Sequence, residues 1–113
     1  MPKKGTIVLI PFPFTDLSSH KVRPAVVLSQ GLKGDDVVLA FVSSQEQKKK
    51  ELTDVLVTRT SKGFTETGLK ADSVVRVSKI ATLDKKIMLG TLGVVSKDTV
   101  KEIDAKIRIL FGV

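Results

Sequence analysis

The chain has 113 residues, 42% of them hydrophobic and none of them cysteine, and it carries a formal net charge of +7. This length predicts one domain, residues 1–113, which can bury a core without disulfide bonds. The lack of cysteine excludes disulfide scaffolds, thiolate metal sites and cysteine nucleophiles. Because the sequence shows no signal-peptide pattern and no run of about 20 apolar residues, we expect a cytoplasmic protein without a membrane span. The excess positive charge favours an anionic partner, commonly nucleic acid, although composition alone leaves an ordinary basic surface open.

The predicted elements begin with a series of short strands. Compact apolar runs rich in β-branched residues predict strands at residues 5–10, 25–29, 37–42, 54–58 and 73–77, with a short sixth at 79–83. We expect Pro11 and Pro13 to end the first strand, because proline has no N–H for the ladder. Residues 61–68, which include two glycines, predict a loop.

Two helical segments follow in the second half of the chain. Asp84 can cap a single turn that Gly90 ends, and Ser96 can cap a longer helix that Gly112 ends. The longer helix has an apolar stripe at helical spacing, expected in the core or in a dimer contact: Val100, Ile103, Ile107 and Leu110. Strands followed by one helix predict an α+β, mainly β fold with a curled antiparallel sheet or small barrel.

Few side chains are available for chemistry. With one histidine and no cysteine, we expect no metal site, and no glycine-rich motif indicates a nucleotide cofactor. A Ser-His-Asp triad with His20 and Asp16 is disfavoured, because no Gly-x-Ser-x-Gly segment exists. Arginine, hydroxyl, histidine and lysine side chains remain, and RNA cleavage can use them. The substrate's own 2′-OH attacks the phosphorus, so the protein need only move protons and neutralise phosphate oxygens.

Two segments are distinctive: residues 11–16, Pro-Phe-Pro-Phe-Thr-Asp, and residues 21–29, Lys-Val-Arg-Pro-Ala-Val-Val-Leu-Ser. In these segments the chain resembles the MazF/PemK toxins of bacterial toxin–antitoxin pairs. The likeness continues through residues 40–45, 68–70, 73–77 and 81–85 and includes the closing helix. The resemblance implies an SH3-like small β-barrel with a C-terminal helix and a homodimer. It also implies metal-independent, sequence-selective cleavage of single-stranded RNA, and inhibition by a cognate antitoxin protein.

The resemblance also implies which residues form the site. The family's catalytic arginine of Arg-Pro corresponds to Arg23, and its hydroxyl residue at the end of the third strand corresponds to Ser43. The candidate substrate-binding residues are Phe14, Thr15, Asp16, His20, Lys21, Pro24, Ser44, Gln45 and Arg76.

The chain departs from the family pattern at three places. Ser43 stands where members often carry threonine. Residues 76–78 are Arg-Val-Ser where some members have Arg-x-Asp, so no carboxylate base is supplied there. Residues 81–84 are Ala-Thr-Leu-Asp where many have Arg-Thr-x-Asp.

Alternatives on the same scaffold remain open. One is a gyrase-directed binding protein of the CcdB type, and another is a non-catalytic module that binds RNA or an antitoxin. The retained Arg23 favours cleavage, whereas the absent Arg-x-Asp pattern keeps the non-catalytic version open. Arg76 could face a groove or join a salt bridge. Phe12 and Phe14 could stack on bases or fill the barrel, and the lysines at 48–50 could guide RNA or form a solvated loop.

Overall fold

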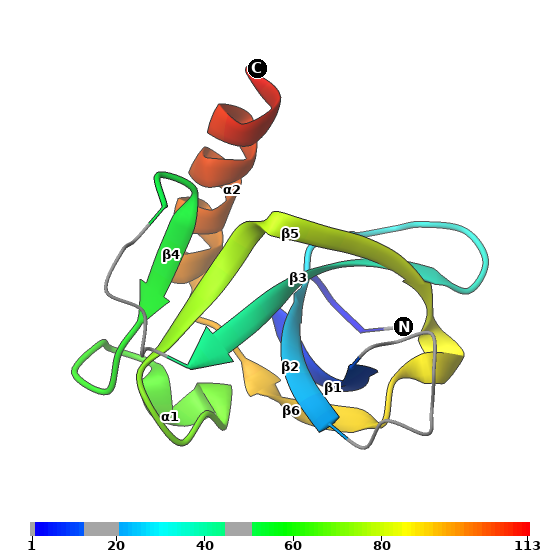
Figure 1. The fold of residues 1–113 in the computed structure, drawn as a ribbon, viewed down its shortest axis with the longest axis horizontal. Coiled ribbons are helices and arrows are strands. Elements are labelled where there is room, and N and C mark those ends of the chain that lie inside the picture. The colour runs from blue at the N-terminus through cyan, green and yellow to red at the C-terminus, as the bar shows by residue number, and fades with distance from the viewer. Residues whose placement is uncertain (1, 13–20, 45–50) are drawn as a thin grey trace.

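A computed structural model of the protein describes residues 2–12, 21–44 and 51–113. In this part of the chain, six strands form one antiparallel sheet in the order β4-β5-β3-β2-β1-β6. Figure 1 shows the sheet curling around itself, with α2 beside β4 and β5. The α+β, mainly β fold with a small barrel-like sheet and a C-terminal helix is therefore confirmed. The elements are β1 (Thr6–Phe12), β2 (Lys21–Val27), β3 (Asp36–Ser44), β4 (Asp54–Val57), α1 (Phe64–Thr67), β5 (Ser73–Asp84), the 3₁₀ turn η1 (Lys85–Ile87), β6 (Gly90–Val94) and α2 (Lys97–Phe111).

The two faces of the sheet bury separate apolar clusters, because successive strand residues point to opposite faces. The first cluster includes Ile103 of α2 and consists of Ile7, Val26, Ala40, Val42, Val55, Val57, Val75, Val77, Val95 and Ile103. The second cluster consists of Val8, Ile10, Ala25, Val27, Val37 and Leu39. The helix thus covers one face of the sheet, and the other face curls over its own smaller core.

Helix α2 forms where the sequence predicts it. The Ser96 side chain accepts a hydrogen bond from the Thr99 N–H at 3.1 Å, and Gly112 ends the helix with a φ of 70°. Ile103 is 1% exposed, and the other three residues of the predicted stripe pack against the first cluster. Hydrophobic spacing and local capping therefore act together at this helix.

The prediction that Pro11 ends the first strand is wrong. Strand β1 continues to Phe12, and Pro11 is paired with Val22 of β2. The Leu9 carbonyl accepts from the Leu89 N–H on the β6 side. Residues two apart on a strand direct their backbone groups to the same side, so Pro11 also faces that side, beyond the last β6 pair at Leu9. Its missing N–H therefore interrupts no ladder bond to β2.

Strand β5 replaces the two strands predicted at residues 73–77 and 79–83. It runs without a break from Ser73 to Asp84 along β3. Its register shifts from Ala40↔Ile80 to Phe41↔Arg76, so residues 77–79 form a bulge opposite a single step of β3. The bulge bends the strand, which explains why the local pattern looks like two elements.

Two elements form where the sequence does not predict them. The expected loop at 61–68 contains the short helix α1, and residues 90–94 form strand β6, in which two of five positions are glycine. A Cβ at Gly93 would lie 2.2 Å from the Glu66 carbonyl oxygen. Glycine, which weakens a strand signal, is therefore required here because α1 packs directly on β6.

The predicted turn after Asp84 is η1, whose cap is the Asp84 side chain accepting from the Lys86 N–H at 2.9 Å.

Candidate active site

Three polar side chains project from the face of the sheet opposite α2. Ser43, Asp54 and Arg76 each adjoin, in sequence, a valine of the first cluster: Val42, Val55 and Val75. Because neighbours on a strand alternate, these polar side chains point to the other face. Arg23 lies on that face as well, since it is two residues from Ala25 of the second cluster.

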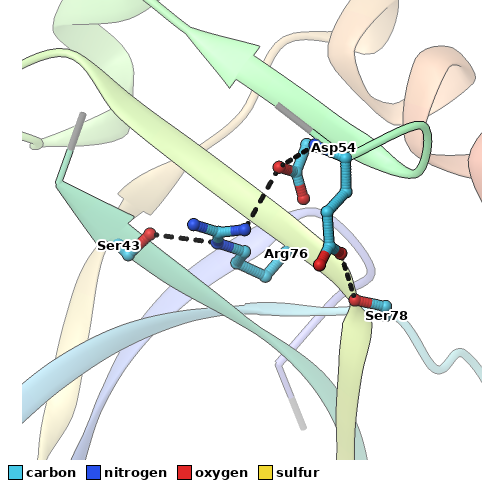
Figure 2. A network of polar contacts seen from close by, with 5 residues as sticks. Ser43, Asp54, Arg76 and Ser78 are labelled. Carbon is cyan, nitrogen blue, oxygen red and sulfur yellow. Dashed lines mark hydrogen bonds and ion pairs between the residues drawn. The ribbon is translucent and has the colours of Figure 1, made fainter. Parts of the chain in front are cut away.

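Arg76 lies at the centre of this group. Strand pairing places it directly opposite Asp54 of β4 on one side and opposite Phe41 of β3 on the other. Its Nη1 is 3.2 Å from Asp54 Oδ2, and its Nε donates to Ser43 Oγ over a long 3.5 Å. Figure 2 shows the guanidinium lying between the two side chains. Arg76 therefore links a carboxylate on β4 to a hydroxyl at the end of β3.

The carboxylate of Asp54 is the most deeply buried polar group of the site. Its side chain is 1% exposed, against 12% for Arg76. Oδ2 also accepts from the Glu51 N–H at 2.9 Å, and the Asp54 N–H donates to the Glu51 carbonyl at 3.0 Å. Among the described residues, Oδ1 has no hydrogen-bond donor. The guanidinium is thus the counter-ion that compensates the burial of this charge.

A second carboxylate joins the network at the β5 bulge. The Ser78 hydroxyl donates to Glu51 Oε2 at 3.1 Å (Figure 2). Residue 78 itself supplies no carboxylate, as the sequence indicates, but Glu51 brings one to the same place from the segment before β4. Ser43, Arg76, Asp54, Glu51 and Ser78 therefore form one continuous chain of polar contacts.

Arg23 is placed near this network by the strand register. Strands β2 and β3 pair through Ala25↔Phe41, and continuing that register by two residues sets Arg23 across from Ser43. Arg23 is half-buried and is paired on its other side with Ile10 of β1. Two arginines and a serine hydroxyl consequently share one face of the sheet at the ends of adjoining strands.

The predicted site residues fall into three groups. Ser43 and Arg76 are in contact, and Arg23 is brought near by register. Lys21 is exposed at the start of β2, Pro24 is half-buried beside Arg23, and Ser44 is exposed at the end of β3. The remaining predicted residues lie outside the described residues: Phe14, Thr15, Asp16, His20 and Gln45.

Sequence reasoning missed Asp54 and Glu51. Asp54 opens a predicted strand, where aspartate commonly indicates a turn, and only the pairing of β4 with β5 brings it to Arg76. For Arg76, the salt bridge that the sequence left as one of two possibilities is present. The site therefore contains two acidic side chains: Asp54 pairs with Arg76, and Glu51 accepts a hydrogen bond from Ser78.

The arrangement is suited to binding an anion. Guanidinium groups supply several fixed N–H donors, and a serine hydroxyl that accepts from Nε keeps its own hydrogen available for donation.

Within residues 2–12, 21–44 and 51–113, no group of three or more histidine and acidic side chains could hold a metal ion. No helix in this part of the chain is long and apolar enough to cross a membrane.

The fold and the site define a small barrel-like protein that carries a basic, hydroxyl-bearing candidate site on the sheet face opposite its C-terminal helix. The family model described as the PemK-like, MazF-like toxin of the type II toxin–antitoxin system matches residues 3–111. The chain therefore belongs to this toxin family, and the resemblance drawn from its sequence motifs is confirmed.

Solved structures of similar fold agree with this assignment. A mycobacterial endoribonuclease in complex with its cognate antitoxin aligns over 100% of this chain and 97% of its own, with 18% identity and a TM-score of 0.77. The Mycobacterium tuberculosis toxin MazF-mt6 aligns over 96% and 97%, with 17% identity and a TM-score of 0.74. A MazE–MazF structure from Deinococcus radiodurans aligns over 99% and 96%, with 23% identity and a TM-score of 0.73. Comparison with curated protein sequences found no match.

Proposed function

We propose that this protein is the toxin of a toxin–antitoxin pair and acts as a metal-independent endoribonuclease on single-stranded RNA. The observation that carries the proposal is the contact between Arg76 and Ser43 on the face that Arg23 shares. Membership of the toxin family supports it, as does the naming of two structural relatives as endoribonucleases. The net charge of +7 suits a polyanionic substrate.

The reaction would begin with the substrate's own nucleophile. The 2′-oxygen bonds to the adjacent phosphorus as its proton passes to a base, and the bond from phosphorus to the 5′-oxygen breaks as that oxygen gains a proton. The products are a 2′,3′-cyclic phosphate and a 5′-hydroxyl end. In the transition state, negative charge accumulates on the non-bridging phosphate oxygens. Preorganised hydrogen-bond donors directed at these oxygens therefore lower the barrier most effectively.

We assign the stabilisation of charge on the non-bridging oxygens to Arg23 and Ser43. The guanidinium of Arg23 can bind two phosphate oxygens at once and is the main source of charge compensation in this scheme. Ser43 Oγ already accepts from Arg76 Nε, so its hydrogen can be donated to a non-bridging oxygen. Because arginines supply the positive charge, this scheme needs no metal ion. A DNA strand lacks the 2′-OH and would be bound without being cut.

The other proposed contacts extend along the RNA. Lys21 and Arg76 share the face of Arg23 and Ser43, whereas strand alternation directs Pro24 and Ser44 to the other face, so these two are proposed from the family resemblance. Phe14, Thr15, Asp16, His20 and Gln45 are proposed from the family resemblance alone. We further propose that the active form is a homodimer and that a cognate antitoxin protein inhibits it, as the antitoxin complex of the mycobacterial relative suggests.

The test is incubation of the purified protein with a mixed single-stranded RNA in EDTA. We expect discrete fragments with 2′,3′-cyclic phosphate ends. Arg23→Ala should abolish cleavage while the fold stays intact by circular dichroism. Arg108→Ala is the matched control, because it removes the same charge from an exposed position on α2.

Four results would contradict the proposal. Unchanged cutting by Arg23→Ala would remove that residue from the mechanism. Cleavage that requires added Mg²⁺ would refute metal independence. Tight RNA binding without any cleavage would favour the non-catalytic module, and inhibition of gyrase without RNA cleavage would favour the CcdB-type alternative.

A further inference from the structure

The buried Asp54–Arg76 ion pair carries a high desolvation cost for a small sheet. The two residues are directly opposed on β4 and β5, and the next pair along the same strands is Val55↔Val75. Removing two charges from water can cost more than their attraction returns, so two apolar side chains would stabilise such a position equally well or better. One oxygen of Asp54 also has no donor among the described residues. Stability alone therefore does not account for the pair.

The pair does determine how Arg76 is oriented. A guanidinium is planar, so a contact of Nη1 with Asp54 restricts rotation about the end of the side chain. With Nη1 held 3.2 Å from Oδ2, Nε is directed at Ser43 Oγ on the neighbouring strand. A lysine ammonium has no such fixed geometry and could not hold both partners in set directions.

Asp54 is itself held firmly in place. Its backbone and side chain make reciprocal hydrogen bonds with the backbone of Glu51, which close the turn that leads into β4. The unpartnered Oδ1 leaves Arg76 as the single positive group in contact with this buried carboxylate within the described residues. The carboxylate is thus a rigid anchor at one end of the Asp54–Arg76–Ser43 chain.

We propose that Asp54 is a positioning residue for RNA cleavage, which fixes Arg76 so that Arg76 orients the Ser43 hydroxyl toward the substrate phosphate. This inference rests on the proposed function. Arg76 Nε occupies an acceptor site on Ser43 Oγ, so the Ser43 hydrogen is directed away from Arg76. Asp54 touches no substrate and acts through Arg76 alone.

The test compares Asp54→Asn with the wild type in steady-state cleavage of a defined single-stranded RNA. Asparagine keeps the shape and can still accept from the Glu51 N–H, but it removes the counter-ion of Arg76. We expect kcat to fall on the order of 10²-fold, as for a misplaced catalytic group, with KM unchanged. Asp35→Asn is the matched control, because it changes the net charge equally at the exposed Asp35–Lys85 pair, and kcat should be unaffected.

A double-mutant cycle separates positioning from an independent effect. In an Arg76→Gln background, Asp54→Asn should cause no further loss of kcat, because the residue through which it acts is already gone. Unchanged kcat in Asp54→Asn alone, or an equal additional loss in the Arg76→Gln background, would overturn the proposal.

Two further measurements test the role of Asp54 if Asp54→Asn does not fold or if the wild type does not cleave RNA. If Asp54→Asn does not fold, Arg76→Lys retains the charge without the planar fork. Its kcat should fall similarly, and full activity would refute the need for orientation. If the wild type does not cleave RNA, the proposed function fails, and ¹⁵N-arginine side-chain NMR still reports on positioning. Restricted rotation of the Arg76 guanidinium should be lost in Asp54→Asn, and an unchanged signal would refute the role of Asp54.

Discussion

Gly93 is a position at which a single added methyl group should clearly disturb the fold. It lies in β6, and a Cβ built there would meet the Glu66 carbonyl oxygen at 2.2 Å and the Thr67 carbonyl carbon and oxygen at 2.5 Å. Side-chain atoms at the end of a flexible chain could move aside, but these are backbone atoms of α1. Because real Cβ contacts essentially never fall below 3.0 Å, Gly93→Ala should push the backbone of α1 away from the sheet.

The magnitude follows from what α1 buries. Thr67 is 2% exposed, and Phe64 and Leu69 pack against the first cluster, so a displaced α1 loosens one end of that core. Forcing an extra carbon into a well-packed site costs about 1–3 kcal/mol. With an unfolding entropy of about 2.1 cal/mol/K for each of the 113 residues, this lowers the melting temperature by about 4–13 °C.

The assay is thermal unfolding followed by circular dichroism at one fixed protein concentration. Gly90→Ala is the matched control, because it adds the same methyl group to the same strand where no atom lies within 4 Å. Its melting temperature should stay within about 2 °C of the wild type, as for other surface changes of under about 0.5 kcal/mol. Equal melting temperatures for the two variants would refute the packing argument.

Two other stability predictions concern α2. Ser96→Ala removes the side-chain acceptor of the Thr99 N–H and should lower the free energy of unfolding in urea by about 1 kcal/mol. Ser96→Asp restores a capping oxygen and should lower it much less. Equal losses in the two variants would show that the cap contributes nothing. Ile103→Ala leaves a cavity in the first cluster and should cost about 2–5 kcal/mol, against under 1 kcal/mol for Ile109→Ala on the exposed side of the helix; similar losses in both would contradict the burial of Ile103.

The position of α2 and most of the strands could be predicted from the chain alone. Ser96, the apolar stripe and Gly112 act within one helix, so their effect is local and visible in the order of residues. Residues 25–27, 37–42, 55–57 and 74–75 are apolar because each face of this sheet buries its own cluster. The motif around Arg23 and Pro24 likewise indicates the toxin family from the sequence alone.

The elements that were missed depend on contacts between distant segments. Strand β6 contains Gly93 because the backbone of α1 requires the space, and that contact joins residues more than two dozen positions apart. The unbroken course of β5 depends on a bulge against β3, which no local pattern records. Pro11 is tolerated in β1 because its missing N–H faces the side beyond the β6 pairing.

For the site, the sequence by itself determined the residue types: arginine beside proline, a serine after a buried strand, and no thiol or histidine cluster. Only the tertiary structure decided that Asp54 lies opposite Arg76 and that Glu51 brings a carboxylate to Ser78. The physical reason is strand register. Side-chain types and their periodicity are properties of one segment, whereas the partner of a side chain across a sheet is decided by how two separate segments align.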